Sequence, residues 1–496
     1  MLKQKFLVQF GSNISLKILG AISGIVVARV AGPEVLGTIA YATAYVSIFG
    51  FITGLFGTSH IKLISEGRNL GKCMSTYTRL QIFSTGLFLL VVLCWFCFQK
   101  FVLHHVFESK VQEQVILITL VAIVFTKLVD FNNSSFTGQL KQTKANLPHL
   151  IRGFLFQVGK IAVVLLGFRA LGLTTWNLIT AVIVLPITYR LFRTLPWEKY
   201  NKQLAKKYIK IAMPILLIVI LSSLMGNIDR LLLQEYTSST ELGYYSIAYS
   251  LGGMILIIRG STGTVFFPLF SSLIAKSDWK TINYKIRLFE SFITTFIFPF
   301  ICLAALISEP LIITILGNTY QHSVLPFAIL IFASYFSIVG MPYGNIITGM
   351  GRFYLSLGLN FAKFLFYIVI LIYLISPQFL GLGAIGVALC VLFVNLIYNS
   401  LFFIVSRKIG NIETHYKNYI RYLIIIIISI SILVSCPYIS EISDFWWLIL
   451  ILPYLLLIYG TLFITGLLKR SQVAELLILL NLKITAKYIK NEIKEK

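Results

Sequence analysis

The chain has 496 residues, of which 57% are hydrophobic and only 12% are charged, and its mean hydropathy is +0.87. This composition excludes a water-soluble globular protein with a polar surface. The formal net charge of +24 would suit a nucleic-acid-binding protein, but the distribution of that charge along the chain argues against one.

Apolar runs of about 20 residues, long enough to cross a hydrocarbon core about 30 Å thick, recur from one end of the chain to the other. They predict an all-α, polytopic integral membrane protein with about 14 transmembrane helices. The runs cover residues 8–31, 36–57, 80–99, 111–131, 150–168, 171–190, 211–234, 243–268, 288–308, 323–347, 354–375, 382–406, 422–436 and 445–467.

Basic residues outside these runs gather in alternate loops. If the N-terminus is cytoplasmic, the loops on that side include Arg68, Lys72 and the basic stretch from Arg190 to Lys210, whereas the outer loops carry acids such as Glu235 and Glu309. This positive-inside pattern predicts cytoplasmic N- and C-termini and an even number of spans. The excess charge is therefore a topology signal: we expect anionic membrane lipids as partners, and no nucleic acid.

The chain repeats itself. Residues 136–156 align without a gap with residues 347–367, and residues 33–42 resemble residues 240–249. The aligned pairs are Thr137 and Thr348, Gly138 and Gly349, Lys141 and Arg352, and Arg152 and Lys363, all 211 residues apart, and Gly37 and Gly243, 206 residues apart. Chance matches between apolar segments are the alternative explanation.

The repeat predicts two six-helix lobes, and because six is even, the repeats are parallel rather than inverted. Two facing lobes would enclose a central cleft. The expected parts are an N-terminal lobe at 1–192, a basic cytoplasmic linker at 193–210, a C-terminal lobe at 211–410, two extra helices within 411–468 and a basic cytoplasmic tail at 469–496.

The segment ARVAGPEVLG, residues 28–37, resembles the hallmark of bacterial polysaccharide flippases of the Wzx type, in the multidrug/oligosaccharidyl-lipid/polysaccharide exporter superfamily. Ala31 stands where the family usually has Leu. The resemblance implies a flippase that moves undecaprenyl-pyrophosphate-linked oligosaccharide, for O-antigen, other lipopolysaccharide or capsule, across the bacterial cytoplasmic membrane by alternating access. Protons or sodium ions, and other membrane proteins of polysaccharide assembly, are its candidate partners.

Ionisable side chains inside a bilayer cost about 2.5–3.5 kcal/mol each on insertion scales, so each is a candidate for a polar cleft. Basic groups outnumber acidic ones within the predicted spans, and such a cleft would attract a pyrophosphate. The residues that we expect to bind substrate in this cationic cleft are Lys17, Lys160, Arg259, Lys363 and Arg152. Arg152, Lys127, Asp130 and Glu290 lie near the cytoplasmic ends of their spans. For them the alternative to a role in the cleft is structural: a long basic side chain can extend to water, and an acidic one can contact a partner at the level of the headgroups.

Other residues are candidates for a gate and for sugar contacts. Arg29, Asp229 and Arg230 lie near the outer ends of the first helix of each lobe and could pair across the lobes; Asp229 is also the candidate ion-coupling group. Tyr245 and Tyr249 could stack on sugar rings, with ordinary packing as the alternative. A stripe at Asn13, Lys17, Gly20, Gly24 and Ala28 fits either a cleft or a close-packed neighbour.

The sequence lacks the motifs that a membrane enzyme of glycan assembly generally needs. Its four Asp residues form no DxD motif, and its six His residues show no metal-binding spacing. GRNLGKC, residues 67–73, fails as a phosphate-binding loop because its glycines are too close together and Cys73 replaces the Ser or Thr. We therefore expect no enzyme, cofactor or metal; an ion-coupled multidrug exporter and a glycan-assembly enzyme are the alternative functions.

Overall fold

A computed structural model of the chain describes residues 2–139, 141–413, 420, 424–428, 431 and 451–465. These residues form helices, turns and loops, with no strand among them, which confirms the predicted all-α fold. The chain divides into two compact units, the first ending at Gly243 and the second beginning at Tyr244. The predicted bounds of the lobes and of the linker stay a prediction, and residues 422–423, 429–430, 432–436 and the basic tail at 469–496 lie outside the described residues.

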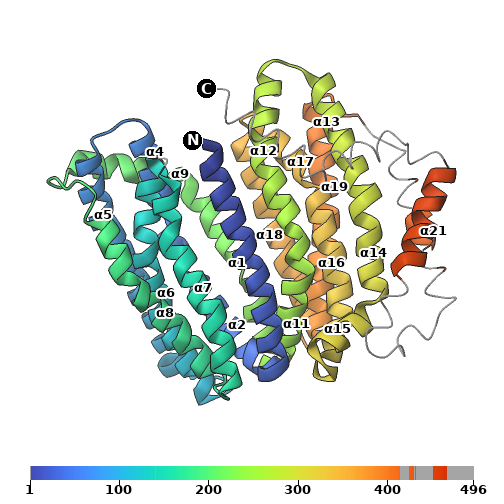
Figure 1. Cartoon of the computed structure of the whole chain (residues 1–496), viewed down its shortest axis with the longest axis horizontal. Helices are drawn as coiled ribbons and strands as arrows, with labels where there is room; N and C mark the ends of the chain where they lie inside the picture. The colour runs from blue at the N-terminus through green and yellow to red at the C-terminus, as the bar shows by residue number, and fades with distance from the viewer. Residues whose placement is uncertain are drawn as a thin grey trace. The chain divides into compact units, whose positions relative to one another are not determined.

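The first unit contains the helices of the first six predicted spans and of the seventh (Figure 1). They are α1 (Leu2–Ala31), α2 (Pro33–Ser47), α3 (Phe51–Gly54), α4 (Gly57–Ser65), α5 (Leu70–Cys97), the π-helical turn η1 (Phe98–Val102), α6 (Lys110–Gly138), α7 (Gln142–Leu165), α8 (Ala170–Phe192), α9 (Lys202–Met225) and α10 (Ile228–Tyr236).

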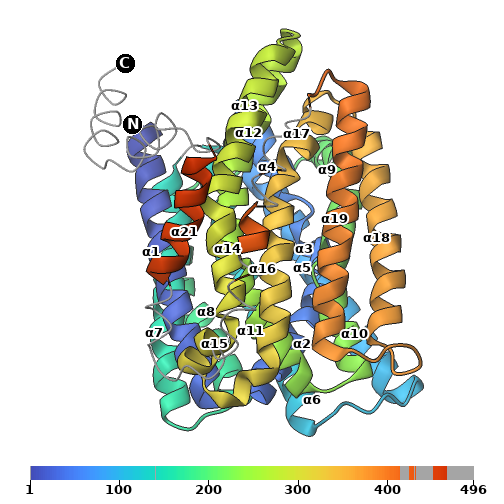
Figure 2. The ribbon, with the colours of Figure 1, turned by 90° about the vertical axis from the view of Figure 1, so that its right-hand side faces the viewer.

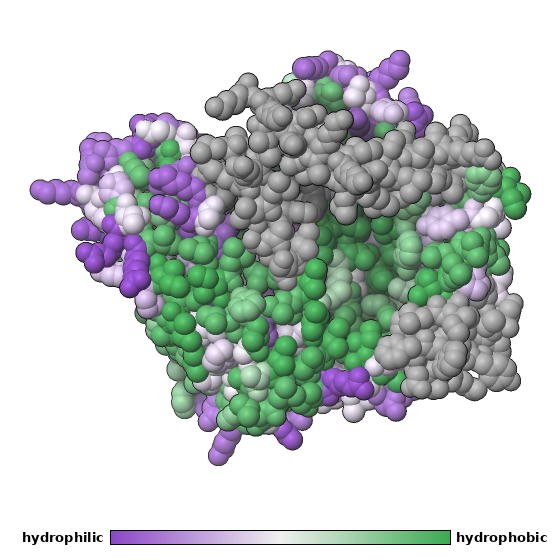
Figure 3. Space-filling model, viewed as in Figure 1, coloured by the Kyte–Doolittle hydropathy of each residue, from purple (hydrophilic) through white to green (hydrophobic). Residues whose placement is uncertain are grey.

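Helix α6 is central to this unit, since it packs on α2, α4, α5, α7 and α8, while α1 packs on α7 and α9 packs on α5. On the face shown in Figure 3, the unit carries a band of hydrophobic side chains with hydrophilic side chains at both ends. That pattern suits helices that cross a membrane.

The second unit contains the helices of the eighth to twelfth predicted spans, two short elements between the ninth and tenth spans, and a helix of the fourteenth. They are α11 (Ser239–Gly252, which begins in the first unit), η2 (Gly253–Ile255), α12 (Leu256–Ala275), α13 (Trp279–Phe292), η3 (Ile293–Ile297), α14 (Phe298–Leu306), α15 (Ser308–Leu316), η4 (Asn318–Ser323), α16 (Val324–Val339), α17 (Met341–Gly349), α18 (Phe353–Ile375), α19 (Gly383–Ile409) and α21 (Ile451–Ile464). Helix α19 packs on α16 and α18, and α12 packs on α17 (Figure 2).

Within the described part of the chain, ten helices are long and apolar enough to cross a membrane, or eleven if the bent pair Pro33–Ser47 and Phe51–Ser65 forms one span. The chain is thus a multi-pass membrane protein, whereas the predicted total of 14 spans is not confirmed. Of the last two predicted spans, only part of each is described: 424–428 and 431 in the first, and α21 in the second.

The two units build their hydrophobic clusters from repeat-equivalent elements. In the first, the ends of α4, α6 and α8 contribute Ile64, Phe136 and Leu191. In the second, Phe270, Ile347 and Phe402 are the corresponding residues on α12, α17 and α19, at the spacings of 206 and 211 residues found in the sequence. Packing thus follows the internal repeat.

The segments that follow α8 and α19 are each held by a polar side chain of an earlier helix, which bonds to their backbone. Ser75 on α5 bonds both the backbone N–H, at 3.2 Å, and the carbonyl of Glu198. Asn283 on α13 donates to the carbonyl of Asn411 at 2.7 Å and accepts from the N–H of Glu413 at 3.2 Å. In each unit, the segment after a long helix, α8 or α19, is therefore tied to the start of an earlier helix.

Candidate functional site

Two basic side chains of the second unit, Arg259 on α12 and Lys363 on α18, make their polar contacts with uncharged groups. Arg259 Nη1 donates to the Ser337 hydroxyl at 2.6 Å, and Lys363 Nζ donates to Asn395 Oδ1 at 3.2 Å. The Lys363 ammonium also lies 4.4 Å from the centroid of the Tyr398 ring, a cation–π contact. No described acidic side chain forms an ion pair with either cation.

The two cations lie within electrostatic reach of each other, and Arg259 also acts on Tyr398. Like charges repel each other, so an anion that lies between the two cations would be stabilised by both. Each keeps N–H donors beyond the one bonded to Ser337 or Asn395. The pair can therefore bind the oxygens of a phosphate group.

Helix α19 positions this pair of cations. Asn395 and Tyr398 are three residues apart, on one face of the helix, and α19 packs against both α16 and α18. Asn395 Nδ2 donates to the carbonyl of Ala333 at 3.1 Å, which turns Oδ1 toward Lys363. Our sequence reasoning missed Asn395, Tyr398 and Ser337; the polar stripe at residues 395, 398 and 399 within an apolar helix was the available signal.

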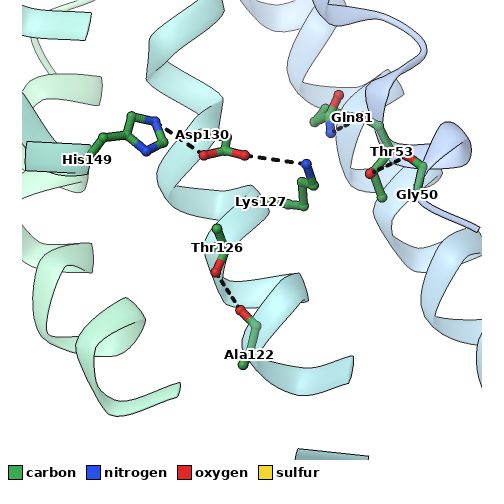
Figure 4. Close-up of polar contacts among 8 residues, drawn as sticks. All are labelled: Gly50, Thr53, Gln81, Ala122, Thr126, Lys127, Asp130 and His149. Carbon is green, nitrogen blue, oxygen red and sulfur yellow. Dashed lines mark hydrogen bonds and ion pairs between the residues drawn. The ribbon is translucent and has the colours of Figure 1, made fainter. Parts of the chain in front are cut away.

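The first unit has its own polar cluster, around Asp130 on α6 (Figure 4). Asp130 Oδ2 lies 3.4 Å from Lys127 Nζ, and its other oxygen lies 3.2 Å from His149 Nε2. One helical turn further along α7, Arg152 donates to Asn177 Oδ1 on α8 at 2.7 Å, and Asp130 acts on Arg152 electrostatically. The cluster joins a single carboxylate to basic residues of two helices.

Arg152 and Lys363 make equivalent contacts. They are 211 residues apart, and each donates to the side-chain carbonyl oxygen of an asparagine on the next long helix of its own unit, Asn177 or Asn395. The sequence repeat thus carries a polar contact as well as apolar packing. Both asparagines escaped the sequence analysis because they do not align with each other in the repeat.

The remaining predicted cleft residues of the first unit, Lys17 and Lys160, are not joined to this cluster. Lys160 Nζ lies 5.5 Å from the Phe156 ring on its own helix, and Lys17 is exposed on α1 without a polar contact to another described residue. The α1 stripe packs in part: a Cβ at Gly20 would lie 3.1 Å from Gln157, whereas one at Gly24 would meet nothing within 4 Å.

The predicted gate residues lie at the ends of α1 and α10. Arg29 is exposed in the last turn of α1. Asp229 is 5% exposed in the first turn of α10, and its Oδ1 accepts the backbone N–H of Arg230 at 2.9 Å. Pairing of these charges across the lobes and a coupling role for Asp229 stay predictions.

The two predicted sugar-contact tyrosines differ in exposure. Tyr245 has no exposed surface, whereas Tyr249 is 37% exposed, and their ring centroids are 5.8 Å apart. Tyr249 lies within electrostatic reach of Arg259. A sugar contact stays a prediction for both.

The N-terminal turns of α2 and α11 cross at two glycines that the repeat makes equivalent. A Cβ at Gly37 would lie 1.6 Å from the Ser239 carbonyl oxygen, and one at Gly243 would lie 1.9 Å from that of Pro33. Residues 33 and 239 are also 206 apart, so the contact is reciprocal. Only glycine permits this approach of two backbones.

Comparison with known proteins places these features in a family. The profile of the family described as "Polysaccharide biosynthesis protein" matches residues 26–325. A search of curated proteins finds none that matches.

Solved structures show the same fold. One is a lipid II flippase MurJ in an inward closed conformation, with a TM-score of 0.73 and 18% identity over 93% of this chain and 100% of that one. Another is an inward-facing multidrug resistance transporter of the MATE family, with a TM-score of 0.63 and 15% identity over 79% of this chain and 94% of that one.

A third solved structure, of a MATE protein in complex with MaD3S, has a TM-score of 0.52 and 16% identity over 82% of this chain and 95% of that one. At such low identities the similarity shows the fold alone. The inward-facing MATE transporter described above is a member of the MOP superfamily. Residues 28–37, which resemble the Wzx-type hallmark, overlap the start of the profile match. The chain belongs to the polysaccharide biosynthesis protein family and has the fold of MOP-superfamily transporters.

Proposed function

We propose that this protein is a flippase that moves undecaprenyl-pyrophosphate-linked oligosaccharide from the inner to the outer leaflet of the bacterial cytoplasmic membrane. The observation that carries the proposal is the pair Arg259 and Lys363, two cations bonded only to uncharged groups among the described residues. Membership of a polysaccharide biosynthesis family supports a glycan cargo.

In this mechanism the pyrophosphate binds between Arg259 and Lys363 and relieves the repulsion between their positive charges. The guanidinium of Arg259 binds phosphate oxygens through its planar fork of donors, and Lys363, oriented by Asn395, adds a compact charge. The glycan follows the bound headgroup as the transporter alternates between its two open states, driven by protons or sodium ions. Other membrane proteins of polysaccharide assembly would supply and receive the cargo.

The test is leaflet translocation of a fluorescent undecaprenyl-pyrophosphate oligosaccharide in liposomes, under proton and sodium gradients. We expect wild type to translocate the lipid and both Arg259→Ala and Lys363→Ala to lose at least about tenfold in rate, since a hydrogen bond to a charged group contributes about 1.5–3 kcal/mol. Lys363→Arg, which keeps the charge, should retain more activity than Lys363→Ala. The control is Lys276→Ala, an exposed lysine in the loop after α12.

Two outcomes would overturn the proposal. If correctly folded wild type leaves the lipid in its original leaflet but exports cationic dyes, the protein is a multidrug exporter, the function of the MATE-family neighbour. If it lengthens or transfers the glycan, it is an enzyme of glycan assembly. Equal rates for wild type and both alanine variants would remove the basic pair from the mechanism.

A further inference from the structure

A second candidate site is a groove within the first unit, formed by α5, α6 and α8. Its volume is about 320 Å³. The lining side chains are mostly apolar, and they include Ile82 on α5, Leu128 and Phe131 on α6, and Leu185 on α8. Thr78 and Thr188 also line it, but their hydroxyls donate to carbonyls of their own helices, so these residues add little free polarity.

The groove opens on a face of the helices that we expect to meet lipid. At its rim, Ile82 is 61% exposed and Tyr189 on α8 is 60% exposed. Exposed large apolar side chains on a membrane-spanning helix are suited to hydrocarbon rather than water. An apolar chain lying in the groove would therefore leave the bilayer without entering a polar environment.

Lys127 is the only charged side chain among the described residues that line this groove. Its ammonium is held weakly: the contact with Asp130 is 3.4 Å long, and Asp130 is shared with His149 at 3.2 Å. Figure 4 shows Lys127 extending from α6 toward α5, where Gln81 lines the groove and donates to the Thr53 carbonyl at 3.0 Å.

We propose that the groove binds an anionic glycerophospholipid of the surrounding bilayer, with an acyl chain against its walls and the phosphate at the Lys127 ammonium. Charge complementarity selects the headgroup: a basic residue between membrane helices near the predicted cytoplasmic side favours an anionic lipid. The apolar walls select the chain. Asp130 competes with the phosphate for Lys127, so removal of its charge strengthens binding. The site is independent of the cargo that we propose for the protein.

The experiment measures lipid binding to the purified full-length protein by native mass spectrometry during titration with phosphatidylglycerol. We expect Lys127→Gln to weaken binding at least fivefold and Asp130→Asn to strengthen it. Misfolding would weaken binding in both variants, so opposite changes distinguish loss of the site from loss of structure. The matched control is Lys144→Gln, an exposed lysine near the start of α7, which should bind like wild type.

Further arms identify the occupant. Phosphatidylcholine, which has no net charge, should bind Lys127→Gln and wild type equally. Undecaprenyl phosphate should not displace phosphatidylglycerol at equimolar concentration; preferential displacement would make the carrier lipid the occupant and overturn the proposal. Equal phosphatidylglycerol affinity for wild type, Lys127→Gln and Asp130→Asn would also overturn it, whatever the translocation assay gives.

Discussion

His60 on α4 is fully buried, and both of its ring nitrogens have partners. Nδ1 lies 2.7 Å from the hydroxyl of Tyr208 on α9, and Nε2 lies 2.9 Å from the hydroxyl of Ser135 on α6. The ring stacks on Tyr77 of α5 with centroids 3.9 Å apart and planes 9° from parallel. One side chain thus joins four helices.

We expect His60→Ala to destabilise the first unit by about 3 kcal/mol, because it leaves a cavity and removes partners from two buried hydroxyls. The measurement is thermal unfolding of the purified protein in detergent, where the midpoint should fall by several degrees. His322→Ala is the matched control, since His322 is an exposed histidine on η4. Equal midpoints for the two variants would contradict the structural role of His60.

For single residues, the sequence indicated candidate charged side chains but not the partners that these side chains contact. Arg259 and Lys363 became candidates because a charge in an apolar run is unusual. Asn177 and Asn395, which hold Arg152 and Lys363, were missed because they do not align with each other in the repeat. His60 was missed because its partners lie 75 and 148 residues away along the chain.

Among the helices, the crossing of α2 and α11 depends on two glycines. A Cβ at residue 37 or 243 would overlap the opposing carbonyl oxygen, so the two backbones would have to separate. We expect Gly37→Ala and Gly243→Ala each to cost about 1–3 kcal/mol, the range for overpacking of a well-packed contact. Thermal unfolding in detergent measures the loss.

The matched control for this pair is Gly24→Ala on α1, where the added Cβ meets nothing within 4 Å. Alanine favours a helix over glycine, so the control should unfold at the same or a slightly higher temperature. If Gly37→Ala behaves like Gly24→Ala, the close approach of α2 and α11 is not a feature of the folded protein.

The same helices show the limits of hydropathy as a guide. The predicted span at 36–57 is broken, with a 53° bend between its parts, and the one at 211–234 divides into α9 and α10 near Gly226. Hydropathy reports how apolar a run is and carries no information on the backbone path. The internal repeat was more informative: it aligned Gly37 with Gly243, and the structure brings these two residues together.

Across the whole chain, the charge pattern and the repeat make one joint prediction: both lobes enter the membrane from the cytoplasm. Each unit has exposed residues at the two kinds of loop. Lys144 and Lys276 lie in loops or helix starts that we expect inside, and Lys110 and Gln378 lie where we expect the outside.

Labelling of single cysteines in intact cells tests this orientation. With the six native cysteines replaced by alanine, Lys110→Cys and Gln378→Cys should react with a membrane-impermeant maleimide. Lys144→Cys and Lys276→Cys should react only after the cells are permeabilised, because their thiols lie in the cytoplasm. Two of these positions belong to the first unit and two to the second. Reversal at 276 and 378 alone would mean inverted repeats, and reversal at all four positions would mean external termini. The first result would contradict the parallel arrangement of the repeats, and the second would contradict the cytoplasmic termini that the positive-inside rule predicts.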